Sequence, residues 1–310
     1  MIAEPSAILV SPAVRAALAE GRGVVALEST ILAHGFPAGE GRALADALQD
    51  AVRAAGAEPA TIAICGGQLC VGLDAARLDA LLDGRKVRKC GARELAWCAA
   101  AGDWGATTVS GTMALAAAAG VRVFATGGIG GVHRGHGELH DVSADLDALA
   151  RFPVLVVAAG AKSLLDLPRT LEALETRGVP VVGFGTDAFP SFYCRESGLR
   201  VGLRVDTPAQ AARAFALQAR IGAAGGALLC NPPPEDAALP RAEVDAWVDA
   251  GLRDAEAAGV RGAAVTPFVL ARLLAISGGR TLRTNRALAL SNATVAGRVA
   301  AALAEHERSA

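Results

Sequence analysis

Short apolar runs bounded by glycine alternate along the chain with longer alanine-rich stretches whose apolar residues recur at helical spacing. Strands that alternate with helices in this way form a mostly parallel sheet covered on both faces. We therefore predict a three-layer α/β/α fold around one central, mainly parallel sheet, with residues 1–310 forming a single domain. The expected strands are Gly23–Glu28, Thr61–Cys65, Val121–Thr126, Val154–Ala159, Val179–Phe184 and Gly226–Cys230. The expected helices are Pro12–Ala19, Gly41–Ala55, Arg93–Ala101, Thr112–Ala119, Ser163–Arg177, Pro208–Gly222, Pro240–Ala258 and Pro267–Ser277.

Composition indicates a core of small aliphatic side chains and argues against a nucleic-acid or membrane protein. Apolar residues make up 52% of the chain but aromatic residues only 4%, so Ala, Val and Leu must fill the core. The net charge of −1 comes from mixed signs and does not suggest a nucleic-acid surface. The weakly polar stretch Ala106–Ala125 is interrupted by Gly120 and Arg122, which predicts a helix followed by a strand rather than a membrane span.

The N-terminal residues and the cysteines favour a cytoplasmic location. Residues Met1–Ser6 lack the basic segment of a signal peptide. The six cysteines contain no Cys-x-x-Cys pair and no disulfide-dense spacing, which agrees with a reducing compartment. We expect each cysteine to be a small core residue rather than a metal ligand.

Lysine is scarce, because only Lys86, Lys89 and Lys162 occur among 30 basic residues. Arginine stays protonated in proteins, whereas a partly buried lysine can lose its proton and act as a nucleophile. Lys162 follows the expected strand Val154–Ala159 and is the strongest candidate for amine chemistry. A chance surface lysine is the alternative at this position. Lys86 and Lys89 lie in a basic cluster that suits either a phosphate group or a solvated face.

Reactive residues follow three of the expected strands. Glu28 ends the first strand, a glycine-rich loop over Gly127–Gly131 follows the strand that ends at Thr126, and Lys162 follows a third. Since ligands bind beyond the carboxyl ends of parallel strands, we expect these residues to meet. Burial of Glu28 raises the pKa of its carboxyl toward a range useful to a general acid. A helix cap or an ion pair with arginine is the alternative for Glu28.

The glycine-rich loop and the polar segment after it could both bind ligands. Gly127–Gly131 allows close approach of the backbone to an anion, although a tight turn explains it nearly as well. Three histidines, His133, His136 and His140, precede Asp141 and Asp145, whose carboxylates would favour Mg²⁺ or Mn²⁺ over zinc. The alternative is that these histidines are merely exposed and that the following Ser-Ala-Asp segment caps a helix.

Asparagine is as scarce as lysine, since it occurs only at positions 231, 285 and 292. Asn285 precedes the apolar stretch Ala287–Leu290, which we expect to be helical. Its amide could therefore hydrogen-bond a substrate or begin that helix.

Read together, five blocks closely resemble the pseudouridine-5′-phosphate glycosidase family, whose members are also called indigoidine synthase A-like proteins. The resemblance covers nearly the whole chain, and the order and spacing of the blocks make it specific. The blocks are Ala26–Gly35, Gly105–Val109, Val123–Gly135, Asp141–Asp145 and Ala159–Asp166.

The resemblance implies an enzyme that reversibly cleaves pseudouridine 5′-phosphate to uracil and ribose 5-phosphate. By it, Lys162 is the Schiff-base nucleophile, Glu28 the proton donor, and Asp141 the ligand of Mn²⁺, with Mg²⁺ possible, largely through water. It further implies a homotrimer that acts on this small molecule, with neither nucleic acid nor membrane as partner. The implied substrate ligands are Lys89, the backbone at Val109, Ser143, Ala144 and Asp145, and His133 and Asn285 line the same pocket.

The chain departs from the usual family pattern at Phe36–Gly41, at Gly66–Gly67 and at Gly262–Ala264. These departures leave the implied catalytic residues in place. Two other functions stay open at this point: a related sugar-phosphate lyase or C-glycoside synthase, and a catalytically silent sensor of sugar phosphates.

Overall fold

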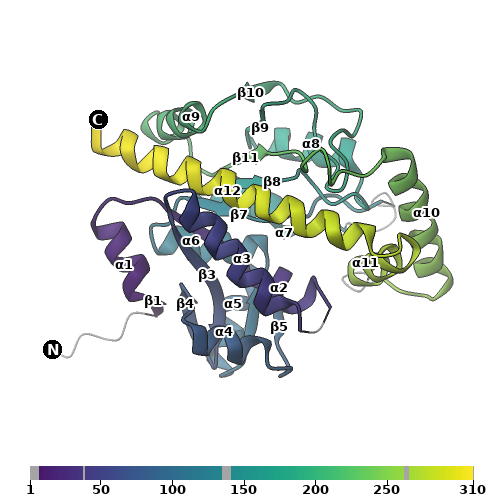
Figure 1. Cartoon of the computed structure of the whole chain (residues 1–310), viewed down its shortest axis with the longest axis horizontal. Coiled ribbons are helices and arrows are strands. Elements are labelled where there is room, and N and C mark those ends of the chain that lie inside the picture. Colours follow the sequence, from purple (N-terminus) through teal and green to yellow (C-terminus); the bar gives the residue numbers. More distant parts are fainter. Residues whose placement is uncertain (1–6, 38, 135–140, 262–264, 310) are drawn as a thin grey trace.

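A computed structural model describes residues 7–37, 39–134, 141–261 and 265–309, and places helices around a central sheet (Figure 1). The strands are β1 (Ile8–Val10), β2 (Val24–Leu27), β3 (Glu58–Cys65), β4 (Gln68–Val71), β5 (Arg88–Cys90), β6 (Gly105–Thr107), β7 (Val123–Ala125), β8 (Leu155–Ala158), β9 (Val181–Phe184), β10 (Leu203–Val205) and β11 (Ala227–Cys230). The helices are α1 (Pro12–Ala19), α2 (Thr30–His34), α3 (Gly41–Ala54), α4 (Ala75–Leu82), α5 (Leu95–Ala100), α6 (Val109–Ala118), α7 (Ala144–Arg151), α8 (Leu167–Thr176), α9 (Pro208–Arg220), α10 (Arg241–Ala257), α11 (Val265–Ile276) and α12 (Arg280–Ser309).

The described strands pair into one sheet with the order β1-β4-β3-β2-β7-β8-β11-β9-β10. Strands β5 and β6 lie off this path, because β6 pairs with the far half of β3 and β5 pairs with β6. Only the pairings of β3 with β4 and with β6 are antiparallel, and the others are parallel. The carboxyl ends of the central strands β2, β7 and β8 therefore meet at one edge of the sheet.

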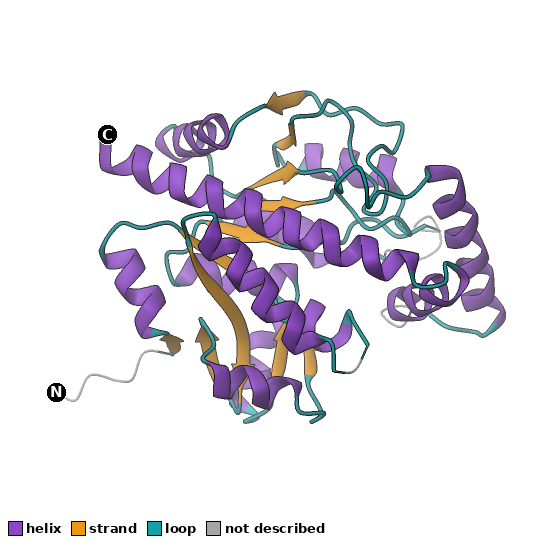
Figure 2. Cartoon of the chain, in the orientation of Figure 1, coloured by secondary structure: helices purple, strands orange, loops and turns teal. Residues whose placement is uncertain are grey.

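Helices cover the sheet, which confirms the predicted α/β/α layers (Figure 2). Helix α12 packs against β2, β7 and β8 and is flanked by α3 and α9, while α6 packs against β2 and β3 and contacts α7. The central strands are buried along their whole length, as parallel strands with helices on both faces must be. Small aliphatic residues and Phe124 fill this core.

The 30-residue helix α12 is the largest difference from the sequence-based expectation. We expected a helix only over Ala287–Leu290 with Asn285 ahead of it, but Asn285 lies inside α12, more than one turn after its start. By length and composition alone α12 is apolar enough to cross a membrane, with a mean hydropathy of 1.4 in its most apolar window. That window is 56% buried inside the protein, because α12 packs against the sheet.

Most of the other expected elements are present with boundaries shifted by a few residues. All six expected strands form, and Ala106–Ala125 contains β6, a helix and then β7, as a chain interrupted by Gly120 would. Ser143 caps α7, because its hydroxyl accepts a hydrogen bond from the amide of Asp145 at 3.2 Å. The six cysteines are buried and unpaired, which confirms their core role. His136, His140 and residues 262–264, to which some of the predictions refer, lie outside the described residues.

Candidate active site

Three neighbouring strand ends bring the candidate catalytic residues together. Glu28 follows β2, Thr126 follows β7, and Lys162 lies four residues beyond the end of β8. The Thr126 hydroxyl donates a hydrogen bond to the Glu28 carboxylate. Glu28 is 9% exposed and Lys162 is half-buried, so both side chains lie in a partly dehydrated site.

The glycine-rich loop continues the sheet past its regular end and holds the lysine segment. Ile129 bridges Ala161 in parallel fashion, and the amide of Lys162 donates to the Ile129 carbonyl at 3.1 Å. A Cβ at Gly128 would lie 2.5 Å from Cδ2 of the Phe192 ring, and one at Gly131 would collide with Thr170. Close packing, rather than a positive φ, therefore explains the glycines of this loop.

Asp145 ties the loop to the start of α6. One carboxylate oxygen accepts from the amide of Ser110 at 3.0 Å, and the other accepts from the amide of Gly130 at 2.8 Å. The residue is 6% exposed. Because a buried carboxylate must be hydrogen-bonded, Asp145 acts first as a clamp between the loop and the helix. To bind substrate as well, the Asp145 carboxylate oxygens would accept further hydrogen bonds with the lone pairs that Ser110 and Gly130 do not use.

Burial raises the pKa of the Glu28 carboxyl, and four neighbouring groups modify that effect. Attraction to Lys162, the hydrogen bond from Thr126 and attraction to Lys89 lower the pKa, whereas repulsion from Asp145 raises it. The net shift is upward, as burial disfavours the charged form. Glu28 therefore holds its proton to higher pH than an exposed glutamate, which suits a general acid.

Lys89 and His133 face the same cluster. Lys89 comes from β5 and is exposed as a residue, yet partial burial and then repulsion from Lys162 lower the pKa of its ammonium group. Asp145 and Glu28 oppose that shift. Burial likewise lowers the pKa of His133, with Asp141 opposing and the two lysines adding to the effect. Lys89, His133, Glu28 and Lys162 are therefore close enough for the charge of one to shift the pKa of another.

The start of α6 offers backbone amides to the same site. Val109 is the first residue of α6, where amides have no partner inside the helix. Cys90, next to Lys89, accepts at its carbonyl a 2.9 Å hydrogen bond from the amide of Thr108, which brings β5 against this helix start. An ammonium group beside a helix N-terminus is a favourable place for an anion.

Asn285 of α12 lies next to Gly127 of the glycine-rich loop. Its amide oxygen is buried and has no hydrogen-bond partner among the described residues. A side chain at Gly127 would lie 3.4 Å from this oxygen, so the acceptor is directed at the glycine-rich loop. An unpaired buried acceptor of this kind is suited to a donor on a ligand.

Asp141 is the candidate ligand of a divalent cation. Its carboxylate is 41% exposed and lies 3.9 Å from His133 Nδ1, and the His133 amide donates to the Asp141 carbonyl at 3.0 Å. Among the described residues no three histidine, cysteine or acidic side chains gather as a metal cage. One accessible carboxylate fits a largely hydrated Mg²⁺ or Mn²⁺ ion and does not fit a protein-enclosed zinc ion.

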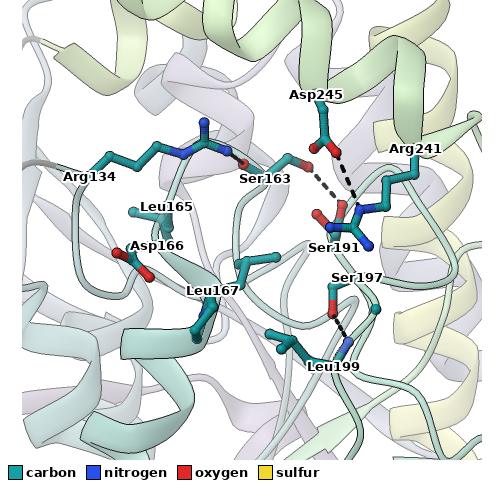
Figure 3. A pocket seen from close by; sticks show the side chains of 12 residues that line it. Arg134, Ser163, Leu165, Asp166, Leu167, Ser191, Ser197, Leu199, Arg241 and Asp245 are labelled. Atoms are coloured by element: carbon teal, nitrogen blue, oxygen red, sulfur yellow. Dashed lines mark hydrogen bonds and ion pairs between the residues drawn. The ribbon is translucent and has the colours of Figure 1, made fainter.

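A cavity of about 390 Å³ lies behind the lysine segment, and Figure 3 shows the residues that line it. The Ser163 hydroxyl donates to the Ser191 carbonyl at 2.7 Å, and Arg134 reaches the Ser163 carbonyl at 3.5 Å. None of the clustered acidic and basic residues around Lys162 lines this cavity. Arg134 and Arg241 are already paired with Asp249 and Asp245. We therefore take the strand ends, and not this cavity, as the candidate active site.

Sequence reasoning missed three residues that support the site. Thr126 hydrogen-bonds Glu28, and the buried pair Asn231 and Asn292 lies behind the glycine-rich loop. The scarcity of asparagine was a usable signal, because all three asparagines of the chain lie next to this loop or the residues that hold it.

Proteins similar to this chain match it over nearly their whole length. A pseudouridine-5′-phosphate glycosidase from Solibacter usitatus is 51% identical over 297 residues, which are 96% of this chain and 98% of that protein. One from Paracoccus denitrificans is 52% identical over 302 residues, 97% of this chain and 99% of that protein. The solved prealnumycin C-glycosynthase AlnA, in complex with ribulose 5-phosphate, superposes with a TM-score of 0.92 at 40% identity, covering 99% of this chain and 100% of that one.

A second solved structure gives the same result. An indigoidine synthase A-like protein from Thermotoga maritima superposes with a TM-score of 0.88 at 32% identity, over 98% of this chain and 99% of that one. The family model described as indigoidine synthase A like protein matches residues 13–302. The chain therefore belongs to the indigoidine synthase A-like protein family.

Proposed function

We propose that the chain is a pseudouridine-5′-phosphate glycosidase, which reversibly cleaves the C-glycosidic bond to give uracil and ribose 5-phosphate. The observation that carries the proposal is a lysine and a buried, proton-retaining carboxyl at the ends of β8 and β2, the two strands that flank β7. Relatives of that name, about half identical over nearly the whole chain, support the choice of substrate.

The bond to be broken explains why a lysine is needed. In pseudouridine a carbon–carbon bond joins ribose C1′ to uracil C5. Ordinary glycosidases protonate the heteroatom of the glycosidic bond to make a leaving group, and this bond has no such heteroatom. A covalent amine intermediate divides this step into two easier ones.

The proposed reaction uses Glu28 as acid and Lys162 as nucleophile. Glu28 donates its proton to the ring oxygen O4′, and the C1′–O4′ bond breaks as the amine nitrogen of Lys162 bonds to C1′. The Glu28 carboxylate then takes a proton from the adduct nitrogen and passes it to uracil C5. The C1′–C5 bond breaks as C5 is protonated, and the freed nitrogen lone pair forms the imine with C1′. Water adds to the imine and releases ribose 5-phosphate, which returns the lysine amine.

Binding of the two halves of the substrate is proposed from the surrounding groups. Lys89 and the amides at the start of α6, near Val109, would hold the phosphorylated ribose. The unpaired oxygen of Asn285 would accept a hydrogen bond from a uracil N–H. Ser143 and Ala144, at the start of α7, together with Asp145 and His133, would close the pocket around the sugar.

Asp141 would hold the divalent cation, Mn²⁺ or Mg²⁺, through water. When bound, the ion would supply positive charge that offsets the charge of the phosphate. The homotrimer and the cytoplasmic location are also part of the proposal. The buried, unpaired cysteines support a reducing compartment, and light scattering of the purified protein tests the trimer.

The deciding experiment incubates the enzyme with pseudouridine 5′-phosphate and Mn²⁺, follows uracil release, and traps the intermediate with borohydride for peptide mapping. We expect uracil and a ribose phosphate adduct on Lys162, and neither in Lys162→Ala. Full activity of Lys162→Ala, or no uracil from the wild type, would exclude the proposal. A panel of C-ribosylated compounds in the same trapping assay identifies a C-glycoside synthase, and sugar-phosphate binding without any adduct identifies a sensor.

A further inference from the structure

Asn292 is a fully buried polar residue on α12 that contacts the end of β7. Its amide nitrogen donates to the carbonyl of Thr126 at 2.8 Å and to the carbonyl of Gly127 at 3.4 Å. Thr126 is the residue whose hydroxyl donates to the Glu28 carboxylate. A single side chain from a distant helix therefore holds the backbone of the residue that contacts the proposed acid.

The sheet is irregular at this point. One backbone hydrogen bond to the Thr126 carbonyl is missing, and the Asn292 side chain provides another in its place. The Thr126 amide donates to the Val157 carbonyl at 3.1 Å, so in a regular parallel ladder the Thr126 carbonyl would accept from the amide of Ala159. The Ala159 amide instead donates to Gly127 at 2.9 Å. The Thr126 carbonyl thus leaves the ladder inside the protein, where an unpaired carbonyl is unfavourable, and Asn292 satisfies it.

Asn231 completes the arrangement from the end of β11. Its side-chain amide donates to the Asn292 oxygen at 2.9 Å and to Ser291 at 3.0 Å, and its backbone amide donates to Ala158 at 2.8 Å. The Asn292 side chain consequently uses both its oxygen and its nitrogen, which fixes its orientation.

We propose that Asn292 is a positioning residue for the reaction: by holding the Thr126 carbonyl, it keeps the Thr126 hydroxyl directed at the Glu28 carboxylate. The inference rests on the proposed function in one respect, namely that Glu28 transfers a proton. Asn292 itself touches neither Glu28 nor Lys162 through any hydrogen bond of the described residues, so its effect passes through Thr126.

The proposal predicts the direction in which the pKa of Glu28 changes when Asn292 is replaced. The charged groups that face Glu28 are Lys162, Asp145 and Lys89, and the hydroxyl of Thr126 stabilises its ionised form. Loss of that hydrogen bond therefore raises the pKa of Glu28 further. The basic limb of the kcat profile, where the acid loses its proton, moves to higher pH.

The test compares Asn292→Leu, Thr126→Val and the double variant with the wild type. The Glu28 carboxyl is followed by ¹³C NMR titration of the free enzyme, with Glu28→Gln to assign its signal, and kcat and KM are measured against pH. We expect Asn292→Leu to raise the Glu28 pKa, to lower kcat about tenfold and to change KM less than about twofold. In the Thr126→Val background, Asn292→Leu should have no further effect on that pKa or on kcat.

Two further variants separate positioning from stability. Asn231→Ala leaves Asn292 in place but removes the donor to its side-chain oxygen. We expect it to raise the pKa of Glu28 by less than Asn292→Leu does. Thr281→Val removes another buried hydroxyl of α12, whose hydrogen-bond partner among the described residues is the hydroxyl of Ser277 at 3.1 Å. This variant should lower Tm without changing the pKa of Glu28.

Two results would overturn the inference: a lower Tm of Asn292→Leu with an unchanged Glu28 titration, or additive effects of Asn292→Leu and Thr126→Val. The titration needs no substrate, so failure of the proposed function is recognised separately, by a wild type that releases no uracil.

Discussion

The hydroxyl of Thr126 donates a hydrogen bond to the carboxylate of Glu28, across the boundary between the parallel strands β7 and β2. The bond favours the ionised carboxylate, whereas burial favours the protonated one, and burial has the larger effect. Glu28 is thus a buried acid whose proton affinity is moderated by a neighbour.

The raised pKa of Glu28 makes its contribution to stability depend on pH. The unfolded chain releases this proton near pH 4.5, but the folded protein keeps it to higher pH, so the stabilising contribution is lost as pH rises through the folded value. We expect the free energy of unfolding of the wild type to fall relative to Glu28→Gln as pH rises from 4.5. Urea unfolding at a series of pH values measures this free energy. Glu20→Gln, at an exposed position, is the control, and its free energy of unfolding should change with pH as that of the wild type does.

Lys162→Arg keeps the charge at the strand end but cannot form an imine, because arginine stays protonated. Uracil release should fall by at least about 10³-fold, and borohydride should trap no adduct by mass spectrometry. Lys86→Arg is the matched control, since Lys86 is exposed and lies outside the cluster. Loss of activity in Lys86→Arg would mean that the basic segment near Lys89 has been assigned wrongly.

Asp145→Asn should loosen the clamp between the glycine-rich loop and α6. An amide offers only one acceptor, so its NH₂ group would face a backbone amide, and the free energy of unfolding should fall by about 2 kcal/mol. Loss of the charge should also lower the pKa of both Glu28 and Lys89. Asp147→Asn on the same helix serves as control, because Asp147 is exposed and, among the described residues, forms an ion pair only with Arg177. Equal destabilisation of the two variants would contradict the clamp.

Gly130→Ala should disrupt the same loop by collision. The new Cβ would lie 2.6 Å from Ser143 Cβ and 2.9 Å from an Asp145 carboxylate oxygen, so the loop must move away from the start of α7. We expect kcat/KM to fall about 100-fold, since small misplacements of catalytic groups are costly to the rate. Gly202→Ala, where no atom of the described residues lies within 4 Å of the new Cβ, should keep wild-type kinetics.

The sequence predicted the parts of the fold that have a strong periodic signal. The buried strands β2, β7, β8 and β11 are continuous apolar runs, and each was expected at its place, as was the half-buried β9. Strand β1 is apolar but was not expected. Strands β4, β5, β6 and β10 contain glutamine, arginine, lysine or threonine within three or four residues, so none of them is a continuous apolar run. The antiparallel pairing of β3 was missed for the same reason.

The candidate site was predictable where residue type alone restricts the chemistry. Lys162 and Glu28 follow strands whose carboxyl ends meet, so their proximity follows from the parallel sheet. Asn292 could not be placed in this way, because its contact with Thr126 joins residues far apart in sequence. Asn285 was misplaced to a helix start, since polar residues recur along α12 and hide its true beginning.

Helix α12 also sets an order of events during synthesis of the protein. Every strand of the sheet precedes it in sequence, so Asn285 and Asn292 leave the ribosome only after β2, β7 and β8 have emerged. Until then the nascent sheet lacks the helix that covers its central strands, and the Thr126 carbonyl has no partner from α12. Catalytic competence therefore arrives late in translation, and a nascent chain stalled before α12 would present an uncovered apolar sheet to chaperones.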